Sequence, residues 1–378
     1  MDKMKKTILV AQVIGMAIDG GVESCIMNYY ENIDREKVQF HFLVESTSKI
    51  INKEKIESMG GKVIIIPHYS HILRYIFYLK RIFIENNYDI VHSNMNALSI
   101  FPLFAAKRAK IGIRIAHSHS TSSKKERKKN LIKNILRKFS KLYATNFFAC
   151  SKEAGIWLFG QKTFDNGKIS IVNNAINLSR FVFDDDKRKT IRRKYEIDGR
   201  FVIGNVGRFV HQKNQKFLIN IFAELLHDIP NAELLIVGDG PLRKSLVKHT
   251  LELGISNRVL FVGNKERVDY YYCAMDYFVF PSLYEGFGMC FVEAQVSGLL
   301  CLGSDMIPAD AIITNNVKLL SLEKSIDVWE RQILLDIKNK GNNNRWYHIF
   351  EKTKYNIDLE ANKLVILYEE IMKGSIKR

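Results

Sequence analysis

The chain has 378 residues, of which 47% are hydrophobic and 26% charged, which is typical of a globular protein and excludes an intrinsically disordered chain. Its length predicts about two domains. The formal net charge of +17 lies mostly in one half: residues 1–180 hold 29 basic and 14 acidic residues, a net +15, whereas residues 181–378 hold 28 and 26, a net +2. This asymmetry indicates an anionic partner for the first half, such as nucleic acid, anionic lipid or a phosphorylated substrate.

The start of the chain and its cysteines indicate a cytoplasmic protein. Thr7–Ile18 follows three lysines and could form a weak signal peptide, but a first β-strand followed by a glycine loop is the better interpretation. No apolar run reaches the ~20 residues that a membrane-spanning helix needs. The five cysteines are irregularly spaced and form no C-x-x-C pair, so we expect no disulfide framework or zinc site.

Short apolar runs alternate with helical patterns, and the alternation starts again after the middle of the chain. Strands are expected over Ile8–Val13, Phe40–Val44, Val63–Pro67, Ile90–Ser93, Ile113–Ala116, Phe201–Val206, Ala232–Val237, Val259–Val262, Tyr277–Pro281 and Leu300–Gly303. Helices are expected over Ile26–Asn32, Ile72–Asn86, Leu98–Ala109, Lys216–Asp228, Leu242–Leu253, Arg267–Ala274, Cys290–Gly298 and Leu359–Met372. This pattern predicts an α/β protein of two doubly wound, Rossmann-like domains facing across a cleft, joined by the polar stretch Phe183–Arg200.

The most specific motif is the stretch from Pro281 to Ala294, which follows a strand and opens a helix. Gly286 and Gly288 allow a sharp turn and a close ligand approach, and the helix N-terminus suits a phosphate. Glu285 and Glu293 are unfavourable beside a phosphate unless they bind something else, and sugar hydroxyls are natural partners. The alternative is a strand–turn–helix with two surface glutamates.

A second loop after a strand contains Gly207, Arg208, Lys213 and Asn214. Two cations there could clamp a diphosphate, with the arginine bidentate, although a solvated basic loop is the alternative. Val237–Pro241 and Asp19–Glu23 add two further glycine turns. Neither dinucleotide nor P-loop fingerprints occur.

Together these motifs resemble the family-4 retaining glycosyltransferases, whose fold is the two-Rossmann-domain GT-B fold. The E-x7-E motif is Glu285 and Glu293, and the other blocks follow in the family's order over nearly the whole chain. Arg114–His119 and Ser304–Pro308 look closest to the branch that builds capsular and extracellular polysaccharides. The chain departs from the family at Ala175, which puts a tight turn in doubt, and at Leu300, which puts a rigid helix exit in doubt.

The resemblance implies transfer from a nucleotide sugar, which we expect to be UDP-linked, with retention at the anomeric carbon. Arg208 and Lys213 would hold the diphosphate, Glu293 the ribose hydroxyls and Glu285 the sugar hydroxyls. His119 or His117 would lie near the transferred sugar; strand periodicity places both on one side, and we favour His119. The remaining donor-binding positions implied are Gly20, Gly21, Gly207, Gly286, Phe287, Gly288 and Met289.

The resemblance also implies a division of labour. Residues 1–180 would bind the acceptor, residues 181–358 the nucleotide sugar, and the last helix, in residues 359–378, would cross back to the first domain. No cofactor or metal is expected, because Asp184–Asp186 is interpreted as solvated and cationic side chains can stabilise the leaving diphosphate.

A basic segment, Lys124–Tyr143, carries an apolar stripe at helical spacing. It is either an ordinary Rossmann helix with solvated lysines or an interfacial helix attracted to anionic lipid. Extracellular polysaccharides of this family are typically built on a polyprenyl-diphosphate carrier at the inner membrane face, which favours a peripheral membrane protein with a lipid-linked saccharide acceptor. Nucleic acid is not an expected partner, since no recognition motif occurs. The membrane-facing residues would be Lys124, Lys125, Lys128 and Lys129.

We therefore expect a glycosyltransferase of capsular or extracellular polysaccharide synthesis. A nucleotide-sugar 2-epimerase of the same fold is the nearest enzyme alternative. A catalytically silent partner of a polysaccharide-synthesis complex is the alternative from another class, and intact Arg208, Lys213, Glu285 and Glu293 argue against it.

Overall fold

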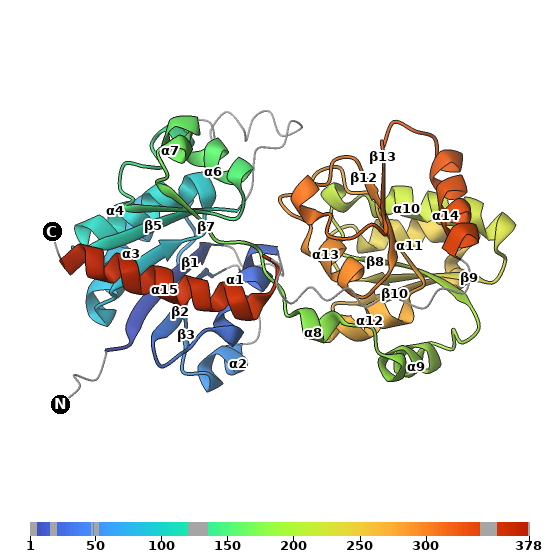
Figure 1. Cartoon of the computed structure of the whole chain (residues 1–378), viewed down its shortest axis with the longest axis horizontal. Coiled ribbons are helices and arrows are strands. Elements are labelled where there is room, and N and C mark those ends of the chain that lie inside the picture. The colour runs from blue at the N-terminus through green and yellow to red at the C-terminus, as the bar shows by residue number, and fades with distance from the viewer. Residues whose placement is uncertain are drawn as a thin grey trace. The chain divides into compact units, whose positions relative to one another are not determined.

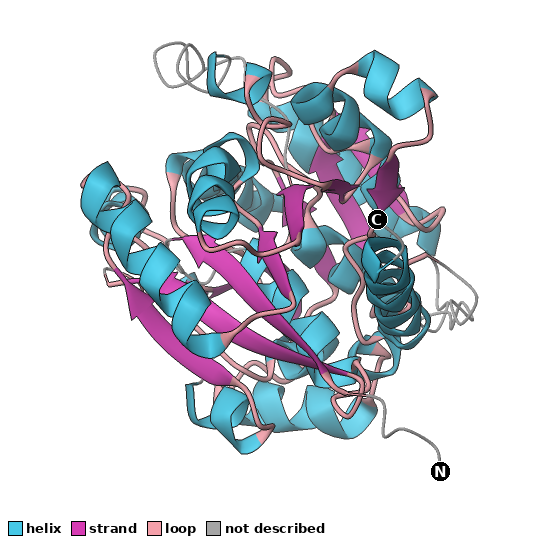
Figure 2. Ribbon diagram, turned by 90° about the vertical axis from the view of Figure 1, so that its left-hand side faces the viewer, coloured by secondary structure: helices cyan, strands magenta, loops and turns pink. Residues whose placement is uncertain are grey.

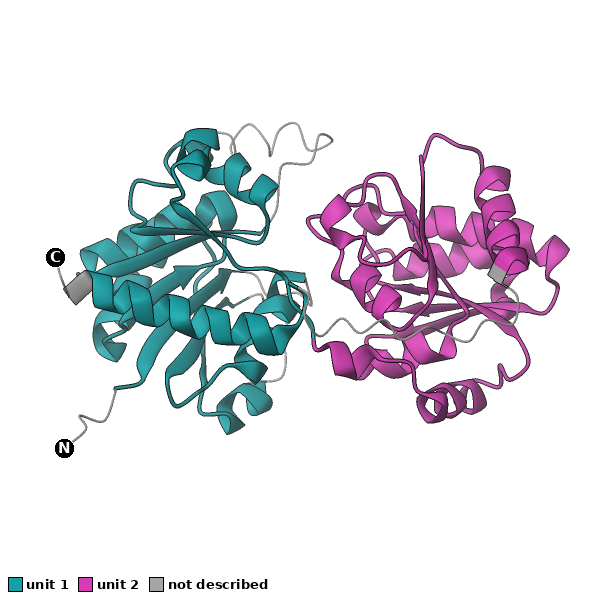
Figure 3. Cartoon of the chain, in the orientation of Figure 1, with its two compact units in different colours: residues 1–176, 352–378 teal, residues 177–351 magenta. Residues whose placement is uncertain are grey.

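The structure, a computed structural model, describes residues 6–15, 21–46, 48, 53–119, 135–340 and 354–376. The chain forms two compact units (Figure 3): unit 1 contains residues 1–176 and 352–378, and unit 2 contains residues 177–351. The C-terminal residues thus group with the N-terminal part of the chain and not with the unit that precedes them in sequence.

Unit 1 is built on a seven-stranded parallel sheet with the order β3-β2-β1-β4-β5-β6-β7 (Figure 1). Its strands are rich in Val, Ile and Phe and mostly buried, as expected of a parallel sheet covered on both faces. The strands are β1 (Ile8–Gly15), β2 (Val38–Glu45), β3 (Lys62–Ile66), β4 (Ile90–Ser93), β5 (Ile113–Ser118), β6 (Asn146–Ala149) and β7 (Ile169–Ile171). The helices are α1 (Gly21–Asn32), α2 (Lys53–Ser58), α3 (Ile72–Asn86), α4 (Ile100–Arg108), α6 (Lys152–Phe159), α7 (Gln161–Asp165) and α15 (Ile357–Ile376), with a 3-10 helix at Asn96–Ser99.

Helices cover both faces of this sheet (Figure 2). On one face α1 and α15 pack side by side, and residues such as Tyr30 and Tyr368 form a core with β1, β2 and β5. On the other face α3, α4 and α6 bury Tyr75, Leu103 and Leu158. The C-terminal helix is therefore a structural layer of unit 1.

Unit 2 repeats the architecture with a six-stranded parallel sheet in the order β10-β9-β8-β11-β12-β13. Its core joins the sheet to α10 and α14 through residues such as Phe222 and Trp329. The strands are β8 (Phe201–Val206), β9 (Ala232–Val237), β10 (Val259–Gly263), β11 (Tyr277–Phe280), β12 (Leu300–Ser304) and β13 (Val317–Leu320). The helices are α8 (Leu178–Phe181), α9 (Asp185–Lys194), α10 (Gln215–Asp228), α11 (Arg243–Glu252), α12 (Val268–Ala274), α13 (Met289–Val296) and α14 (Ile326–Lys340), with 3-10 helices at His211–Lys213, Ser256–Arg258 and Ala309–Ala311.

Both sheets reverse their strand order next to the first strand of the unit, between β1 and β4 in unit 1 and between β8 and β11 in unit 2. Ligands of open parallel sheets bind at the carboxyl ends of the strands that flank such a reversal. The loops after β1, β4, β8 and β11 are therefore the expected ligand-binding loops.

The expected join at Phe183–Arg200 is wrong, because most of this stretch is helix α9 within unit 2. Asp184 caps the helix by accepting a hydrogen bond from the Lys187 N–H (2.9 Å). Arg188 and Arg192 then pair with Asp276 (2.7 and 2.5 Å), which fixes α9 beside the start of β11. The triplet Asp184–Asp186 is exposed, as expected of solvated residues.

The basic segment is described only from residue 135 onward, so Lys124, Lys125, Lys128 and Lys129 lie outside the described residues. Residues 135–138 are helical. Leu136 packs on the core, whereas Ile135, Phe139 and Leu142 of the apolar stripe are 49–59% exposed. In the described parts of the chain, no helix is both long and apolar enough to cross a membrane.

Candidate active site

The loop after β8 is hydrogen-bonded to the turn after β9, and two glycines of that turn allow the close approach. The Gly207 N–H donates to the Val237 carbonyl (3.0 Å), and the Phe209 N–H donates to the Asp239 carbonyl (2.9 Å). A Cβ at Gly238 would lie 2.1 Å from the Gly207 oxygen, and one at Gly240 would lie 2.6 Å from the Phe209 oxygen. The turn Val237–Pro241 thus shapes the loop that carries the two predicted cations.

The same loop is tied to the loop after β11. The Gln212 side-chain amide donates to the Tyr284 carbonyl (2.9 Å), and the Leu283 N–H donates to the Gln212 carbonyl (2.8 Å). Asn214, in the left-handed region at φ 55°, donates its side-chain N–H to the Pro281 carbonyl (3.1 Å). These bonds bring the two most specific motifs of the sequence together.

Lys213 and Glu285 form an ion pair, with Nζ 2.7 Å from Oε1 and side-chain exposures of 16% and 5%. Lys213 Nζ also lies 4.7 Å from the ring centre of Phe280, an aromatic contact that the sequence reading missed. Burial alone would lower the pKa of Lys213, but the Glu285 carboxylate outweighs burial and raises it. The ammonium group is therefore charged and keeps N–H groups beyond the one that Glu285 accepts.

Arg208 differs from Lys213 in having no carboxylate partner. It is half-buried, and its guanidinium forms no ion pair with any residue that the structure describes. An arginine held in a loop with its planar fork unpaired is suited to a phosphate.

The helix of the E-x7-E motif, α13, starts at Met289, and its N-cap is Gly288, whose φ of 92° favours glycine. No side chain among the described residues caps this helix end. Phe287 and Met289 are buried beside it, whereas Gly286 is exposed. The first N–H groups of such a helix carry a partial positive charge that attracts anions.

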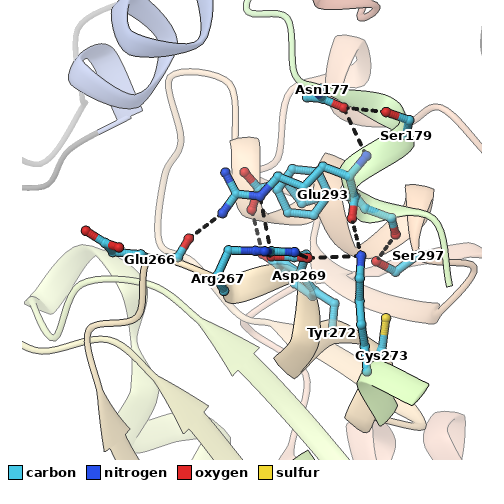
Figure 4. Close-up of polar contacts among 12 residues, drawn as sticks. Asn177, Ser179, Glu266, Arg267, Asp269, Tyr272, Cys273, Glu293 and Ser297 are labelled. Carbon is cyan, nitrogen blue, oxygen red and sulfur yellow. Dashed lines mark hydrogen bonds and ion pairs between the residues drawn. The ribbon is translucent and has the colours of Figure 1, made fainter. Parts of the chain in front are cut away.

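Glu293 lies in α13 and accepts a hydrogen bond from the Tyr272 hydroxyl (2.8 Å), as Figure 4 shows. The same hydroxyl lies 3.1 Å from the Cys290 carbonyl oxygen. Burial raises the pKa of Glu293 to about 6, although the Tyr272 bond and Arg180 act in the opposite direction. Glu293 can therefore gain or lose its proton near neutral pH. Tyr272 was not among the residues that sequence reasoning selected.

A second carboxylate near Glu293 is surrounded by cations (Figure 4). Asp269 is fully buried and pairs with Arg267 (2.8 Å), Lys187 (3.0 Å) and Arg180 (3.4 Å). Burial would raise its pKa, but the hydrogen bonds from Arg267 and Lys187 lower it to about 2. Asp269 is thus a charged anchor that fixes the start of α12, from which Tyr272 reaches Glu293.

In unit 1 the structure brings His117 and His119 together, with ring centres 3.9 Å apart. The His92 ring also lies against His117, with ring centres 5.1 Å apart and 3.0 Å between His92 Nε2 and His117 Nδ1. Burial lowers the pKa of all three, to about 3 for His92 and His119. His117 Nε2 and His119 Nδ1 are buried without a hydrogen-bond partner in the described part of the chain.

The remaining predicted positions lie partly outside the described residues. Gly20 is one of these, and Gly21 is the first residue of α1. All five cysteines are free thiols, and four of them are buried. Within the described ranges no three His, Cys, Asp or Glu side chains gather in a way that could hold a metal ion.

Two family profiles match the chain, one described as Glycosyltransferase Family 4 over residues 19–180 and one described as Glycosyl transferases group 1 over residues 187–352. EpsF of Bacillus subtilis (strain 168), whose name places it among the glycosyltransferases, is 33% identical over 346 residues, which cover 88% of each chain. The Escherichia coli UDP-Gal:alpha-D-GlcNAc-diphosphoundecaprenol alpha-1,3-galactosyltransferase is 24% identical over 331 residues, 82% of this chain and 84% of that one.

Solved structures share the fold over almost the whole chain. HepE of Anabaena, in complex with UDP-glucose, gives a TM-score of 0.74 at 18% identity and covers 98% of this chain and 99% of its own. Sucrose-phosphate synthase of Thermosynechococcus elongatus gives 0.75 at 17% identity, covering 97% and 100%. The predicted GT-B fold is thereby confirmed.

Proposed function

Because the chain belongs to glycosyltransferase family 4, in the capsular and extracellular polysaccharide branch, we propose that it moves a sugar from a UDP-linked donor to a polyprenyl-diphosphate-linked saccharide with retention of configuration. It is a glycosyltransferase of polysaccharide biosynthesis. A UDP-linked donor and a lipid diphosphate acceptor are what the name of the Escherichia coli relative specifies. HepE is similar in fold and binds UDP-glucose.

The observation that carries the donor proposal is the unpaired Arg208 in the loop that also holds Lys213. When the bond from the anomeric carbon to the diphosphate breaks, the electron pair leaves with the nucleotide, and negative charge grows on the diphosphate. Arg208 and Lys213 would stabilise this charge, as preorganised cations do in other group transfers. Glu293 would accept hydrogen bonds from the ribose hydroxyls and Glu285 from those of the sugar, while His119 and His117 would contact the transferred sugar.

A thermal-shift titration tests the donor site. UDP, UDP-glucose, UDP-galactose and UDP-N-acetylglucosamine are added separately, since a ligand that binds the folded state at 100 times its Kd stabilises it by about 2.7 kcal/mol. We expect UDP and at least one UDP-sugar to raise the melting temperature of the wild type but not of Arg208→Ala. Arg258→Ala, whose guanidinium instead pairs with Glu233 in the same unit, is the matched control. Absence of any shift in the wild type would contradict the proposal.

We propose that transfer needs no metal, because Arg208, Lys213 and the start of α13 supply the positive charge at the diphosphate. Activity is then expected to survive EDTA. Complete loss in EDTA, restored by Mg²⁺ or Mn²⁺, would overturn this.

The acceptor proposal includes a peripheral position at the cytoplasmic face of the membrane. Besides the lysines at 124–129, it is supported by α3 of unit 1, whose outer face exposes Leu73 (82%), Phe77 (71%) and Ile84 (56%). Arg74 and Arg81 are exposed on the same helix. An apolar stripe flanked by arginines suits the interface of an anionic bilayer.

Vesicle co-sedimentation at low and high salt tests the membrane proposal with two variants. The first replaces Lys124, Lys125, Lys128 and Lys129 by Gln, and each charge near the surface is expected to contribute about 1 kcal/mol. The second replaces Leu73 and Phe77 by Ser. We expect both to release the protein from anionic vesicles without changing UDP binding. Equal or salt-independent pelleting of wild type and variants would contradict the membrane proposal.

A further inference from the structure

The three adjacent histidines of unit 1, His92, His117 and His119, belong to a longer chain of hydrogen bonds that runs through the C-terminal helix. On one branch His117 Nδ1 lies 3.0 Å from His92 Nε2, and His92 Nδ1 lies 2.7 Å from the Tyr368 hydroxyl. Tyr368 is fully buried on α15. Its sequence distance from His92 is 276 residues, so only the return of the last helix to unit 1 creates this contact.

The other branch runs from Tyr368 to His119 through two buried amides. Gln12 donates its side-chain N–H to the Tyr368 hydroxyl (3.2 Å), and Asn94 donates to Gln12 Oε1 (2.9 Å). His119 Nε2 lies 2.8 Å from Asn94 Oδ1. Gln12 and His92 are directly opposite each other on β1 and β4, the strands that flank the order reversal of the sheet.

Each link constrains the next, because every neutral imidazole has one N–H and one acceptor nitrogen. With the side-chain amides of Asn94 and Gln12 in the orientation of the structure, His119 Nε2–H donates to Asn94 Oδ1. Asn94 in turn donates to Gln12, and Gln12 donates to the Tyr368 hydroxyl. The Tyr368 hydroxyl then donates to His92 Nδ1, and His92 Nε2–H donates to His117 Nδ1. His117 consequently exposes an N–H at Nε2, and His119 exposes an acceptor at Nδ1.

If the side-chain amides of Gln12 and Asn94 are both flipped, the direction of every hydrogen bond in the chain is reversed. His117 Nε2 then becomes the acceptor and His119 Nδ1 the donor. In either arrangement the three histidines share one tautomer, and one of the two unpartnered nitrogens is a donor while the other is an acceptor. A hydroxyl group, which both donates and accepts, is the complement of this pair.

We propose that Tyr368 is a positioning residue that couples the tautomers of His117 and His119, so that the two rings offer one donor and one acceptor to a single hydroxyl of the transferred sugar. The identity of that hydroxyl as a sugar group rests on the proposed function, whereas the coupling does not.

Long-range ¹H–¹⁵N spectra of histidine-labelled protein test the coupling without any ligand. We expect the wild type to show His92, His117 and His119 all protonated at Nε2 or all at Nδ1. A mixture of the two tautomers among these rings would overturn the proposal, and this readout needs no variant to fold.

Tyr368→Phe removes the hydroxyl that joins the branches, and we expect the ¹⁵N shifts of at least one of the three rings to move toward values averaged over both tautomers. Tyr29→Phe is the matched control: Tyr29 is buried in the same core and donates to the Asn173 carbonyl (2.6 Å), outside the chain of bonds. We expect it to leave the spectrum unchanged. Unchanged histidine signals in Tyr368→Phe would overturn the role of Tyr368.

Adding UDP and then UDP-glucose, as the probes, tests the sugar contact. We expect UDP-glucose to shift His117 Nε2 and His119 Nδ1 and UDP alone to leave them unmoved. If UDP-glucose binds by thermal shift without moving these signals, the sugar contact is wrong and the donor proposal survives. If no nucleotide sugar binds, the proposed function fails, while a shared tautomer in the free protein still supports the coupling.

Discussion

The predicted site residues in the loop after β8, Arg208 and Lys213, are cations, whereas the histidines at the ends of β4 and β5 are neutral. In unit 2 the Lys213–Glu285 pair raises the pKa of the lysine, and cations around Asp269 hold its carboxyl pKa at about 2. In unit 1, burial lowers the pKa of His92 and His119 to about 3, so these rings carry no charge at neutral pH.

The two sheets share the same reversal of strand order, but the buried polar groups near it are charged in unit 2 and neutral in unit 1. Charged groups in a low-dielectric site need partners, and unit 2 supplies one to Lys213, whereas Arg208 has no ion-pair partner among the described residues. The histidines of unit 1 satisfy each other as neutral donors and acceptors, leaving two nitrogens over. The first arrangement suits a diphosphate, and the second suits an uncharged hydroxyl.

The largest expected effect is the loss of turnover on removing Arg208, one of the cations of unit 2. In the proposed reaction, Arg208→Ala would remove a cation from a diphosphate that gains charge as the bond breaks, and losing such a contact costs about 3–4 kcal/mol, or roughly 10²–10³ in turnover. Steady-state kinetics with a saturating donor measure it. Near-normal turnover in a folded variant would show that Arg208 does not contact the diphosphate.

Lys213 needs a different variant, because Lys213→Ala would leave the Glu285 carboxylate, 5% exposed, without its partner. Removing one member of a buried pair typically costs about 3–5 kcal/mol of stability. Lys213→Met combined with Glu285→Gln removes both charges and avoids this cost. We expect it to melt near the wild-type temperature and to lose turnover by at least as much as Arg208→Ala.

The neutral histidines of unit 1 predict that the stability of this unit falls at acid pH. In the unfolded chain a histidine takes up a proton below its ordinary pKa of about 6.5, whereas His92 and His119 in the folded state do so only near pH 3. Their contribution to stability is therefore complete above about pH 6.5 and falls as the pH drops toward 3. The loss is about 1 kcal/mol per histidine between pH 6.5 and 5.5.

Hydrogen exchange at β4 and β5, corrected for intrinsic rates, measures this loss within unit 1. His92→Gln removes one titrating ring and should flatten the pH dependence by roughly a third if three rings contribute equally. Equal protection at pH 7.5 and pH 5.5 would show that these histidines are not held neutral by the fold.

The local patterns of the sequence predicted most of the sheet and the charged loop, but not the groups that hold the loop. Apolar runs such as Phe201–Val206 and Ala232–Val237 are strands with those bounds, and Arg208, Lys213 and Glu285 lie on adjoining loops. The sequence did not predict the short strands β6, β7 and β13, of three or four residues, although it predicted β4 and β11, which have four residues each.

No local sequence pattern indicated the residues that contact the site from distant parts of the chain. Tyr272 and Asp269 lie in the predicted helix Arg267–Ala274 and Tyr368 lies in the predicted helix Leu359–Met372, but nothing in those segments of the sequence marked them as partners of site residues. The charges of Phe183–Arg200 suggest a linker, whereas two of its arginines, Arg188 and Arg192, pair with Asp276, which lies 84 to 88 residues away. Such contacts follow from topology, which places distant segments together.

The smallest expected effect concerns Glu293, and it has opposite signs for stability and for binding. Burial raises its pKa in the folded protein to about 6, above the value of 4.5 for an unperturbed Glu. Its favourable contribution is therefore present below about pH 4.5 and is lost as the pH rises through 6, since the folded state must then hold a buried carboxylate. A shift of this size corresponds to roughly 1–2 kcal/mol.

Glu293→Gln keeps an oxygen that can accept the Tyr272 hydrogen bond but carries no charge. We expect the variant to be more stable than the wild type at pH 7.5, by about 1–2 kcal/mol, and equal to it at pH 4.5. It should bind UDP about tenfold more weakly, because hydrogen bonds to a charged acceptor are worth about 1.5–3 kcal/mol and an amide replaces it poorly. Glu252→Gln, at a 56% exposed position in the same unit, should change neither property. Urea unfolding at both pH values and a UDP titration measure the two effects. A variant that loses stability at pH 7.5 would show that Glu293 is a structural carboxylate, and one that binds UDP normally would remove it from the donor site.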